Sequence, residues 1–273
     1  MTQVATKADC ITAMRALKQR ANLIIADPPY NYGQAYDSYS DNKSYTEYMD
    51  WTLSWLTAAN EALDKRGTMW IFAPDEWVSE IDVAVKQKLR LHKRQHVIWA
   101  FTFGQNCRKK FTRSHCHLLY YVKDRTSFTF NPELLLVPSA RQLIYKDKRA
   151  DAKGRLPDDT WMLLHQQLLP YMGGDKDVWL ESRVCGTFKE RKNHSPNQIP
   201  VPIMERILLA CSDPGDFVLD PFAGTCSSGV ACAKHARKWQ GYDLSKRCVL
   251  EGNRRIKEAS VTEEKPAKPK SKK

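Results

Sequence analysis

The chain has 273 residues, 42% of them hydrophobic, and its 43 Lys and Arg outnumber its 31 Asp and Glu to give a formal net charge of +12. This length supports one sizeable α/β domain with an inserted lobe. The sequence contains no run of about 18 apolar residues and no signal-peptide layout, which predicts a soluble, cytoplasmic protein without a membrane segment. Its eight cysteines form no C-x-x-C pair, which argues against a zinc site and a disulfide framework.

The N-terminal part alternates between strands and helices. Apolar patterning predicts a short strand to Asp9 and further strands over residues 23–26 and 68–73. The same patterning predicts helices over residues 11–20 and 46–63. Residues 31–45 between them are polar and rich in Tyr, so we expect a mobile lid over a substrate.

The strand over residues 23–26 runs directly into Asp27-Pro28-Pro29-Tyr30. A buried strand that ends in an acid delivers a carboxylate to the carboxyl edge of a sheet. The two prolines stiffen the turn and offer carbonyls without competing N–H donors, and Tyr30 adds a ring face. An acid, a rigid carbonyl and a ring suit a planar group that bears an NH2. Taken alone, these four residues are equally typical of a strand that ends in a Pro-Pro turn beside a half-buried Tyr.

The middle of the chain is strongly basic. Strands are predicted over residues 97–101 and 118–122, and a helix over residues 160–169. Residues 86–125 contain eleven Lys or Arg and a single acid, and residues 141–155 contain six basic residues. Such a concentration of charge suits a phosphate backbone, although a solvated face of a basic protein is the alternative. The candidate DNA-binding residues are Arg108, Lys109, Lys110, Arg113, Lys146, Lys148 and Arg149.

The run His115-Cys116-His117 invites a metal-binding interpretation. On a strand, however, His115 and His117 share one face while Cys116 points to the other. The three side chains then do not converge, and we predict a partly buried strand without a metal.

A second candidate site lies near the C-terminus. A helix over residues 203–211 precedes a strand over residues 216–220, a small-residue loop, a helix over residues 230–235 and a strand that ends in Asp243. The strand-loop-helix layout places backbone N–H groups against an anionic or nucleoside ligand, and Gly224 permits close approach. Thr225, Ser227 and Ser228 suit either a helix cap or a carboxylate ligand. Asp243, about 20 residues on, is the usual partner of a ribose diol.

The two sites together resemble the beta class of amino-group DNA methyltransferases, in which D-P-P-Y comes first and F-x-G-x-G last. The resemblance covers most of the chain. Ala8-Asp9-Cys10 stands at the family's G-D-C, residues 25–31 match the catalytic motif and residues 220–224 match the cofactor loop. Residues 183–200, which end in His194-Ser195-Pro196-Asn197-Gln198-Ile199-Pro200, resemble the helix lead-in. Two positions depart from the pattern. Cys226 replaces the second glycine of the loop, and Ile199 replaces a lysine suited to the methionine carboxylate. A Thr or Ser hydroxyl, His194 or a backbone N–H is then the expected partner.

The resemblance implies a Rossmann-like α/β methyltransferase fold, with a mostly parallel sheet, helices on both faces and a circularly permuted motif order. It divides the chain into a catalytic half (residues 1–103), a target-recognition and DNA-binding region (104–175), a cofactor-binding half (176–260) and a disordered basic tail (261–273). Strands from both chain ends would then lie side by side.

The function implied is methyl transfer from S-adenosylmethionine to the N6 amine of an adenine flipped out of double-stranded DNA. The Asp27 carboxylate and the Pro28 carbonyl would accept the two amine hydrogens, and Tyr30 would stack on the base. The catalytic residues implied are Asp27, Pro28, Pro29 and Tyr30. The cofactor-binding residues implied are Asp9, Cys10, Asp27, His194, Asp220, Phe222, Ala223, Gly224, Thr225, Ser227, Ser228, Asp243 and Leu244.

Several alternatives stay open at this point. The same motif serves N4-cytosine DNA methyltransferases, RNA adenine methyltransferases and inactive nucleic-acid-binding proteins of the same fold. A nicotinamide dehydrogenase is disfavoured because the opening G-x-G-x-x-G is missing, and cytosine C5 transfer because no Pro-Cys pair supplies a thiolate. The expected location is a bacterial or phage-infected cell, and a homodimer is compatible with the resemblance.

Overall fold

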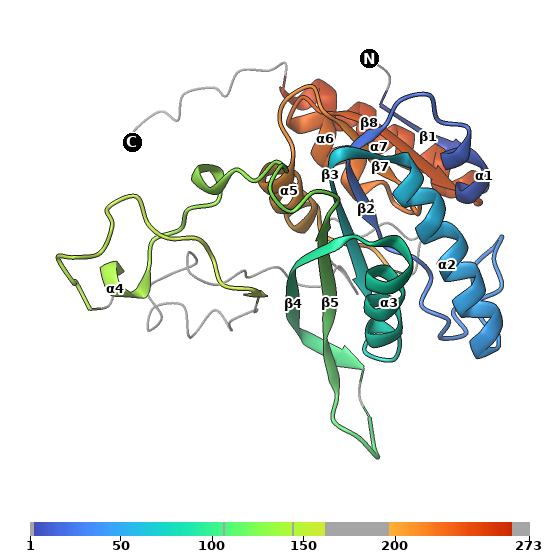
Figure 1. Cartoon of the computed structure of the whole chain (residues 1–273), viewed down its shortest axis with the longest axis horizontal. Helices are drawn as coiled ribbons and strands as arrows, with labels where there is room; N and C mark the ends of the chain where they lie inside the picture. Colours follow the sequence, from blue (N-terminus) through green and yellow to red (C-terminus); the bar gives the residue numbers. More distant parts are fainter. Residues whose placement is uncertain (1–2, 106, 144, 162–196, 264–273) are drawn as a thin grey trace, which may run out of the picture.

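The computed structural model describes residues 3–105, 107–143, 145–161 and 197–263, which form one sheet with helices on both faces (Figure 1). Its strands are β1 (Val4–Lys7), β2 (Ala21–Ala26), β3 (Leu63–Ala73), β4 (His92–Gln105), β5 (Arg113–Val122), β6 (Thr160–Trp161), β7 (Phe217–Asp220) and β8 (Lys238–Asp243). Its helices are α1 (Cys10–Arg15), α2 (Tyr45–Ala62), α3 (Val78–Ala84), α4 (Ala140–Leu143), α5 (Val201–Cys211), α6 (Ser227–Lys234) and α7 (Lys246–Glu263), with a π-helical turn η1 (Val85–Leu89) and a 3-10 turn η2 (Pro132–Leu134).

Segments from the two ends of the chain share the sheet. The strand order is β1-β8-β7-β2-β3-β5-β4-β6. Neighbours from β1 to β3 are parallel, β5 is antiparallel to β3 and β4, and β6 is parallel to β4. The strands β7 and β8 thus lie between β1 and β2, with Leu219 of β7 opposite Ile24 of β2. The predicted α/β class and mostly parallel sheet are confirmed. The permutation of the motifs stays an interpretation.

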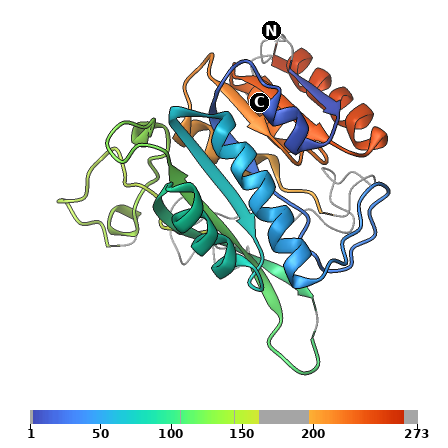
Figure 2. The same cartoon turned by 45° about the vertical axis from the view of Figure 1, so that its right-hand side comes forward.

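Both faces of the central strands are covered by helices. In β2, Leu23 and Ile25 pack in the core beneath α5, α6 and α7, whereas Ile24 and Ala26 pack in the core beneath α1, α2 and α3. All four side chains are buried. Figure 2 shows α1, α2 and α3 along one face of the sheet. Two-sided burial explains why β2 is apolar at nearly every position instead of alternating.

The helix predicted over residues 46–63 is confirmed as α2. Ser44 caps it, because its hydroxyl accepts from the Glu47 N–H while the Glu47 carboxylate accepts from the Ser44 N–H across 2.9 Å. The buried stripe of α2 includes Tyr48 and Trp55, both fully buried. This helix therefore packs firmly on the sheet close to where β2 ends.

The structure differs from the predictions at two places. The helix predicted over residues 160–169 is wrong at its start, because Thr160 and Trp161 form β6 against Ile98 and Trp99 of β4. Thr and Trp favour strands, and the edge of β4 offers them backbone partners. Residues 162–169 lie outside the described residues. The helix α7 extends to Glu263, three residues into the expected disordered tail, and the rest of that tail is also outside them.

The hairpin of β4 and β5 is much longer than the two strands predicted. It projects from the body of the protein, as both views show (Figures 1 and 2). Between β5 and β6 the regular elements are only the short turns η2 and α4, within residues 123–143 and 145–159. Of the helices in the described ranges, none has the length and apolar character needed to cross a membrane.

Candidate active site

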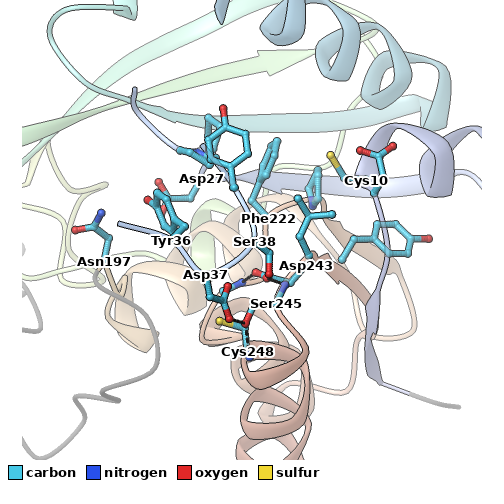
Figure 3. A pocket seen from close by; sticks show the side chains of 18 of the residues that line it. Cys10, Asp27, Tyr36, Asp37, Ser38, Asn197, Phe222, Asp243, Ser245 and Cys248 are labelled. Atoms are coloured by element: carbon cyan, nitrogen blue, oxygen red, sulfur yellow. Dashed lines mark hydrogen bonds between the residues drawn. The ribbon is translucent and has the colours of Figure 1, made fainter. Parts of the chain in front are cut away.

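Four segments meet where the parallel strands end. Asp27 follows β2, Phe222 follows β7, Asp243 ends β8 and Asp9 follows β1. Together they line a cavity of about 430 Å³ (Figure 3). The cavity brings together these residues predicted from the sequence: Asp9, Cys10, Asp27, Pro28, Pro29, Tyr30, Phe222, Gly224, Asp243 and Leu244. The carboxyl edge of a parallel sheet is where such folds bind ligands.

Asp243 is held in place by backbone donors from two loops. Its Oδ2 accepts the Gly224 N–H across 2.9 Å, and its Oδ1 accepts the Ser245 N–H across 2.7 Å. Burial nevertheless raises the pKa of Asp243, and these backbone hydrogen bonds act in the opposite direction. The carboxylate is therefore oriented before any ligand arrives, beside the glycine that permits close approach.

Asp9 and Cys10 line the cavity next to Asp243, since the Ala8 N–H donates to the Asp243 carbonyl across 3.1 Å. Asp9 caps α1, accepting the Thr12 N–H across 2.9 Å and the Thr12 hydroxyl across 2.8 Å. Burial raises the pKa of Cys10 to about 12, so it is a neutral thiol at physiological pH. Together they offer one fixed acid and one small apolar side chain.

Several residues predicted to bind the cofactor are buried beneath the surface of the first cavity, in and around the loop that follows β7. Asp220 accepts the Phe222 N–H across 3.0 Å and the Ser228 hydroxyl, and Ser228 also accepts from Trp239 Nε1 across 3.1 Å. These contacts fix the turn from inside. The cavity lining does not include Asp220, Ala223, Thr225, Ser227 or Ser228, which are all buried. Their direct contact with a cofactor stays a prediction, and His194 lies outside the described residues.

Cys226 occupies the position of the missing glycine with left-handed backbone geometry, at φ 57°. Its side chain is fully buried and turns toward α7. There Gly252 makes room for it, since a Cβ on Gly252 would lie 2.2 Å from the Cys226 Sγ. The thiol therefore packs inside the protein and does not line the cavity.

The catalytic motif carries a contact that the sequence did not indicate. The Tyr30 hydroxyl donates to Asp27 Oδ1 across 2.7 Å and lies 3.5 Å from Cys116 Sγ. Burial raises the pKa of Asp27 to about 6, and the Tyr30 hydrogen bond opposes that rise. Tyr30 therefore modulates the carboxylate, in addition to the stacking role predicted for its ring.

A second cavity, of about 600 Å³, lies on the other side of this motif. Its lining includes the aromatic side chains Trp99 and Phe101, and Ile199 from the predicted lead-in. The residues that line both cavities are Asp27, Tyr30, Tyr36 and Asn197. Figure 3 shows Asp27, Tyr36 and Asn197 near one another in the first cavity. A carboxylate between two adjoining cavities suits a reaction between two bound molecules.

The predicted lid is a segment anchored at both cavities. Asp41, which is 3% exposed, accepts the backbone N–H groups of Asn31, Tyr32 and Gln34 across 2.8–3.0 Å. Farther along, Asp37 Oδ2 accepts the Ser245 hydroxyl across 2.6 Å. Tyr36, Asp37, Ser38 and Tyr39 all line the first cavity. The richness in Tyr marked this segment, but Ser245, which anchors Asp37, lies far away in sequence and could not be foreseen.

The basic residues predicted to bind DNA fall into three environments. Arg108, Lys109 and Lys110 are exposed in the β4–β5 hairpin, next to Phe111, which is 99% exposed. Arg113 instead forms ion pairs with Asp75, across 2.7 Å, and with Glu76. Arg149 pairs with Asp147, and Lys146 and Lys148 are exposed in the same loop. The hairpin and this loop therefore both present exposed charges, whereas Arg113 is held in ion pairs.

The histidines of β5 lie as the strand pattern predicts. His115 and His117 share a face, with their Nε2 atoms 3.3 Å apart, while Cys116 is buried. His96 Nε2 lies 2.8 Å from His117 Nδ1. Since His117 contacts one histidine through each ring nitrogen, the three rings form a chain instead of facing a common point.

Comparisons with known proteins agree with this geometry. The family model described as DNA methylase, for N6 and N4 amino-group enzymes, matches residues 21–253. The type II methyltransferase M.HpaI of Haemophilus parainfluenzae is 30% identical over 251 residues, covering 90% of this chain and 73% of that protein. The DNA adenine methyltransferase YhdJ of Escherichia coli is 31% identical over 247 residues, covering 89% of this chain and 78% of that protein.

Solved structures confirm the fold. A complex of M1.HpyAVI with S-adenosylmethionine has a TM-score of 0.61 at 19% identity, covering 93% of this chain and 98% of that one. The cytosine-N4-specific PvuII DNA methyltransferase has a TM-score of 0.63 at 14% identity, and the match covers 94% of this chain and 90% of that one. The chain therefore belongs to the N6/N4 family of amino-group DNA methyltransferases, whose methyl donor is S-adenosylmethionine.

Proposed function

We propose that this DNA methyltransferase transfers its methyl group to the N6 amine of an adenine that has left the duplex. The observation that carries the proposal is the position of Asp27 in the wall shared by the two cavities. The motif Asp27-Pro28-Pro29-Tyr30, usual for adenine in this family, supports the choice of base. The relative that is 31% identical and is named a DNA adenine methyltransferase also supports it.

The first cavity fits S-adenosylmethionine. The Asp243 carboxylate, already oriented by Gly224 and Ser245, would accept hydrogen bonds from the ribose hydroxyls. Asp9 and Cys10 would border the adenine ring, and Phe222 and Gly224 the methionyl end. Ile199, which replaces the lysine usual in the family, lines the second cavity and not the first. Its side chain is therefore not part of the lining proposed for the cofactor. The chemistry that this cofactor supplies when bound is an electrophilic methyl group on a sulfonium ion.

The target base would enter the second cavity. Its aromatic walls, Trp99, Phe101 and Tyr30, suit a flat base that has left the stack. An exocyclic amine is a poor nucleophile because its lone pair is drawn into the ring. Asp27, as a carboxylate, would accept one amine hydrogen and the Pro28 carbonyl the other, which would free the lone pair to form the new N–C bond. The methyl–sulfur bond would break in the same step, and its electron pair would return to sulfur, which leaves as a neutral thioether. Asp27 also stabilises the positive charge that develops on nitrogen, and it is placed to take the proton the amine loses.

Duplex DNA is the partner that the charge distribution suits. The hairpin carries Arg108, Lys109 and Lys110 at an exposed tip together with Phe111. Adjacent cations suit phosphate groups, and an exposed aromatic side chain suits contact with bases. The hairpin joins β4 to β5, which also carry Trp99 and Cys116 of the second cavity. Contact at the tip is therefore linked directly to the base-binding wall.

Replacement of Asp27 tests this function. With S-adenosylmethionine and unmethylated duplex DNA, the wild type should transfer methyl groups, and Asp27→Ala should reduce the rate at least about a thousandfold while still binding DNA. A parallel assay on RNA of the same sequence should give no product. An Asp27→Ala rate within about tenfold of the wild type, or transfer to RNA, would contradict the proposal.

A further inference from the structure

Three backbone carbonyls follow Asp27 in the motif, those of Pro28, Pro29 and Tyr30, and two of them accept hydrogen bonds from side chains. The hydroxyl of Tyr48 donates to the Pro29 carbonyl across 2.9 Å. The indole Nε1 of Trp77 donates to the Tyr30 carbonyl across 3.0 Å. In the described part of the chain, no hydrogen bond reaches the Pro28 carbonyl. Of these three carbonyls, the one next to Asp27 is therefore the one without a donor among the described residues.

The two donors form one rigid unit. Tyr48 belongs to α2 and is fully buried, whereas Trp77 precedes α3 and is half-buried. Their rings pack with centroids 4.5 Å apart. A buried tyrosine and an indole have few rotamers left, so each donor holds its carbonyl in one position. Two helices, distant from the motif in sequence, thereby fix the backbone of Pro29 and Tyr30.

The residues that follow are fixed as well. Asp41 accepts the N–H groups of Asn31 and Tyr32, and Asn31 has left-handed geometry at φ 57°. Each residue from Pro29 to Tyr32 is thus hydrogen-bonded through its backbone to a side chain elsewhere, while Asp27 and Pro28 line the first cavity. The motif therefore has one part that is held by the surrounding side chains, from Pro29 onward, and one part that faces the ligand cavity, Asp27 and Pro28.

We propose that Tyr48 and Trp77 are positioning residues for methyl transfer. By engaging the Pro29 and Tyr30 carbonyls, they leave the Pro28 carbonyl as the backbone acceptor for the substrate amine and keep it aligned with Asp27. The inference rests on the proposed function, because it assigns these residues to the same chemical step. Since misplacement by about 1 Å can reduce a rate a hundredfold, removal of one donor should slow that step without preventing ligand binding.

Tyr48→Phe tests the proposal, since it removes the hydroxyl and keeps the buried ring. We expect the single-turnover rate of methyl transfer to fall about tenfold or more, with affinities for S-adenosylmethionine and DNA within about twofold of wild type. Trp77→Phe, which removes the indole N–H, should show the same split between rate and affinity. The matched control is Tyr45→Phe on the same helix. Tyr45 is 59% exposed, and within the described residues its hydroxyl makes no hydrogen bond.

The outcomes are separable. An unchanged single-turnover rate in Tyr48→Phe would overturn the positioning role. So would a fall in rate that is matched by equal decreases in cofactor affinity and thermal stability, because the hydroxyl would then support the fold in general. If the wild type itself transferred no methyl group to DNA, the proposed function would fail before this inference was reached.

Discussion

Tyr30 donates its hydroxyl hydrogen to Asp27 Oδ1 across 2.7 Å, within a motif of four residues. Two opposing effects act on the carboxyl group. Burial favours its protonated form and is the larger effect, whereas the Tyr30 hydrogen bond favours the ionised form, and the resulting pKa of Asp27 is about 6. Asp27 is therefore mostly ionised at neutral pH and mostly protonated at pH values well below 6.

This relationship predicts a pH dependence. Only ionised Asp27 can take up the amine proton and stabilise the positive charge on nitrogen, so kcat/KM should rise as pH increases through about 6. Tyr30→Phe removes the hydrogen bond that lowers the pKa, so the rising limb should move to higher pH. The pH profile of kcat/KM checks this, with the exposed Tyr145→Phe as control. A rising limb at the same pH in Tyr30→Phe would show that the hydrogen bond does not tune the acid.

Removal of the Asp243 carboxylate should weaken cofactor binding. Asp243→Ala should weaken S-adenosylmethionine binding roughly tenfold to a hundredfold, since a hydrogen bond to a charged group is worth about 1.5–3 kcal/mol. Titration calorimetry measures the affinity, and Asp50→Ala, at an exposed position of α2, is the control. Affinity equal to wild type would remove Asp243 from the ribose role.

The exposed basic residues of the β4–β5 hairpin should make DNA affinity depend on salt concentration. Replacing Arg108, Lys109 and Lys110 with Gln should lower DNA affinity and flatten its dependence on salt, by about 0.9 in the logarithmic slope for each phosphate group that is no longer neutralised. The control replaces three exposed basic residues far from the site, Lys18, Lys65 and Arg66, for the same change in charge. Fluorescence anisotropy over a salt series would detect the difference. Equal slopes in the two triple variants would mean that the hairpin does not touch phosphate.

Packing between Cys226 and Gly252 predicts a compensating pair. Gly252→Ala should destabilise the protein by about 1–3 kcal/mol, because the new Cβ would lie 2.2 Å from the Cys226 Sγ. Cys226→Gly in the same chain should recover most of this stability, since it removes the Sγ and suits the left-handed backbone. Denaturant unfolding measures both. Independent, additive effects of the two substitutions would show that they do not share this space.

Much of the site follows from local sequence. The strands β2 and β7 are apolar and buried on both faces, so their residues form recognisable runs, and the fold itself places the acids at the ends of the parallel strands. Asp9, Asp27 and Asp243 therefore meet as expected. The cofactor loop is located by its sequence as well, although the Ser228 hydroxyl turns inward to Asp220 and Trp239 instead of lining the cavity.

The remaining features depend on contacts between distant parts of the chain. No local pattern shows that Tyr48 reaches Pro29, or that Asp37 accepts from Ser245. Nor does local sequence show that Gly252, on another helix, accommodates the Cys226 side chain. Thr160 and Trp161 form a strand because the edge of β4 is available, which outweighs their helical spacing.

The most direct test of the central claim is the identity of the methylated base. Purified protein, S-adenosylmethionine and unmethylated DNA are incubated together, and the DNA is then digested to nucleosides for mass spectrometry. The account predicts N6-methyladenine from the wild type and none from Asp27→Ala. N4-methylcytosine as the product would contradict the assignment of adenine, and the absence of any methylated base from protein that binds the cofactor would contradict methyl transfer to DNA.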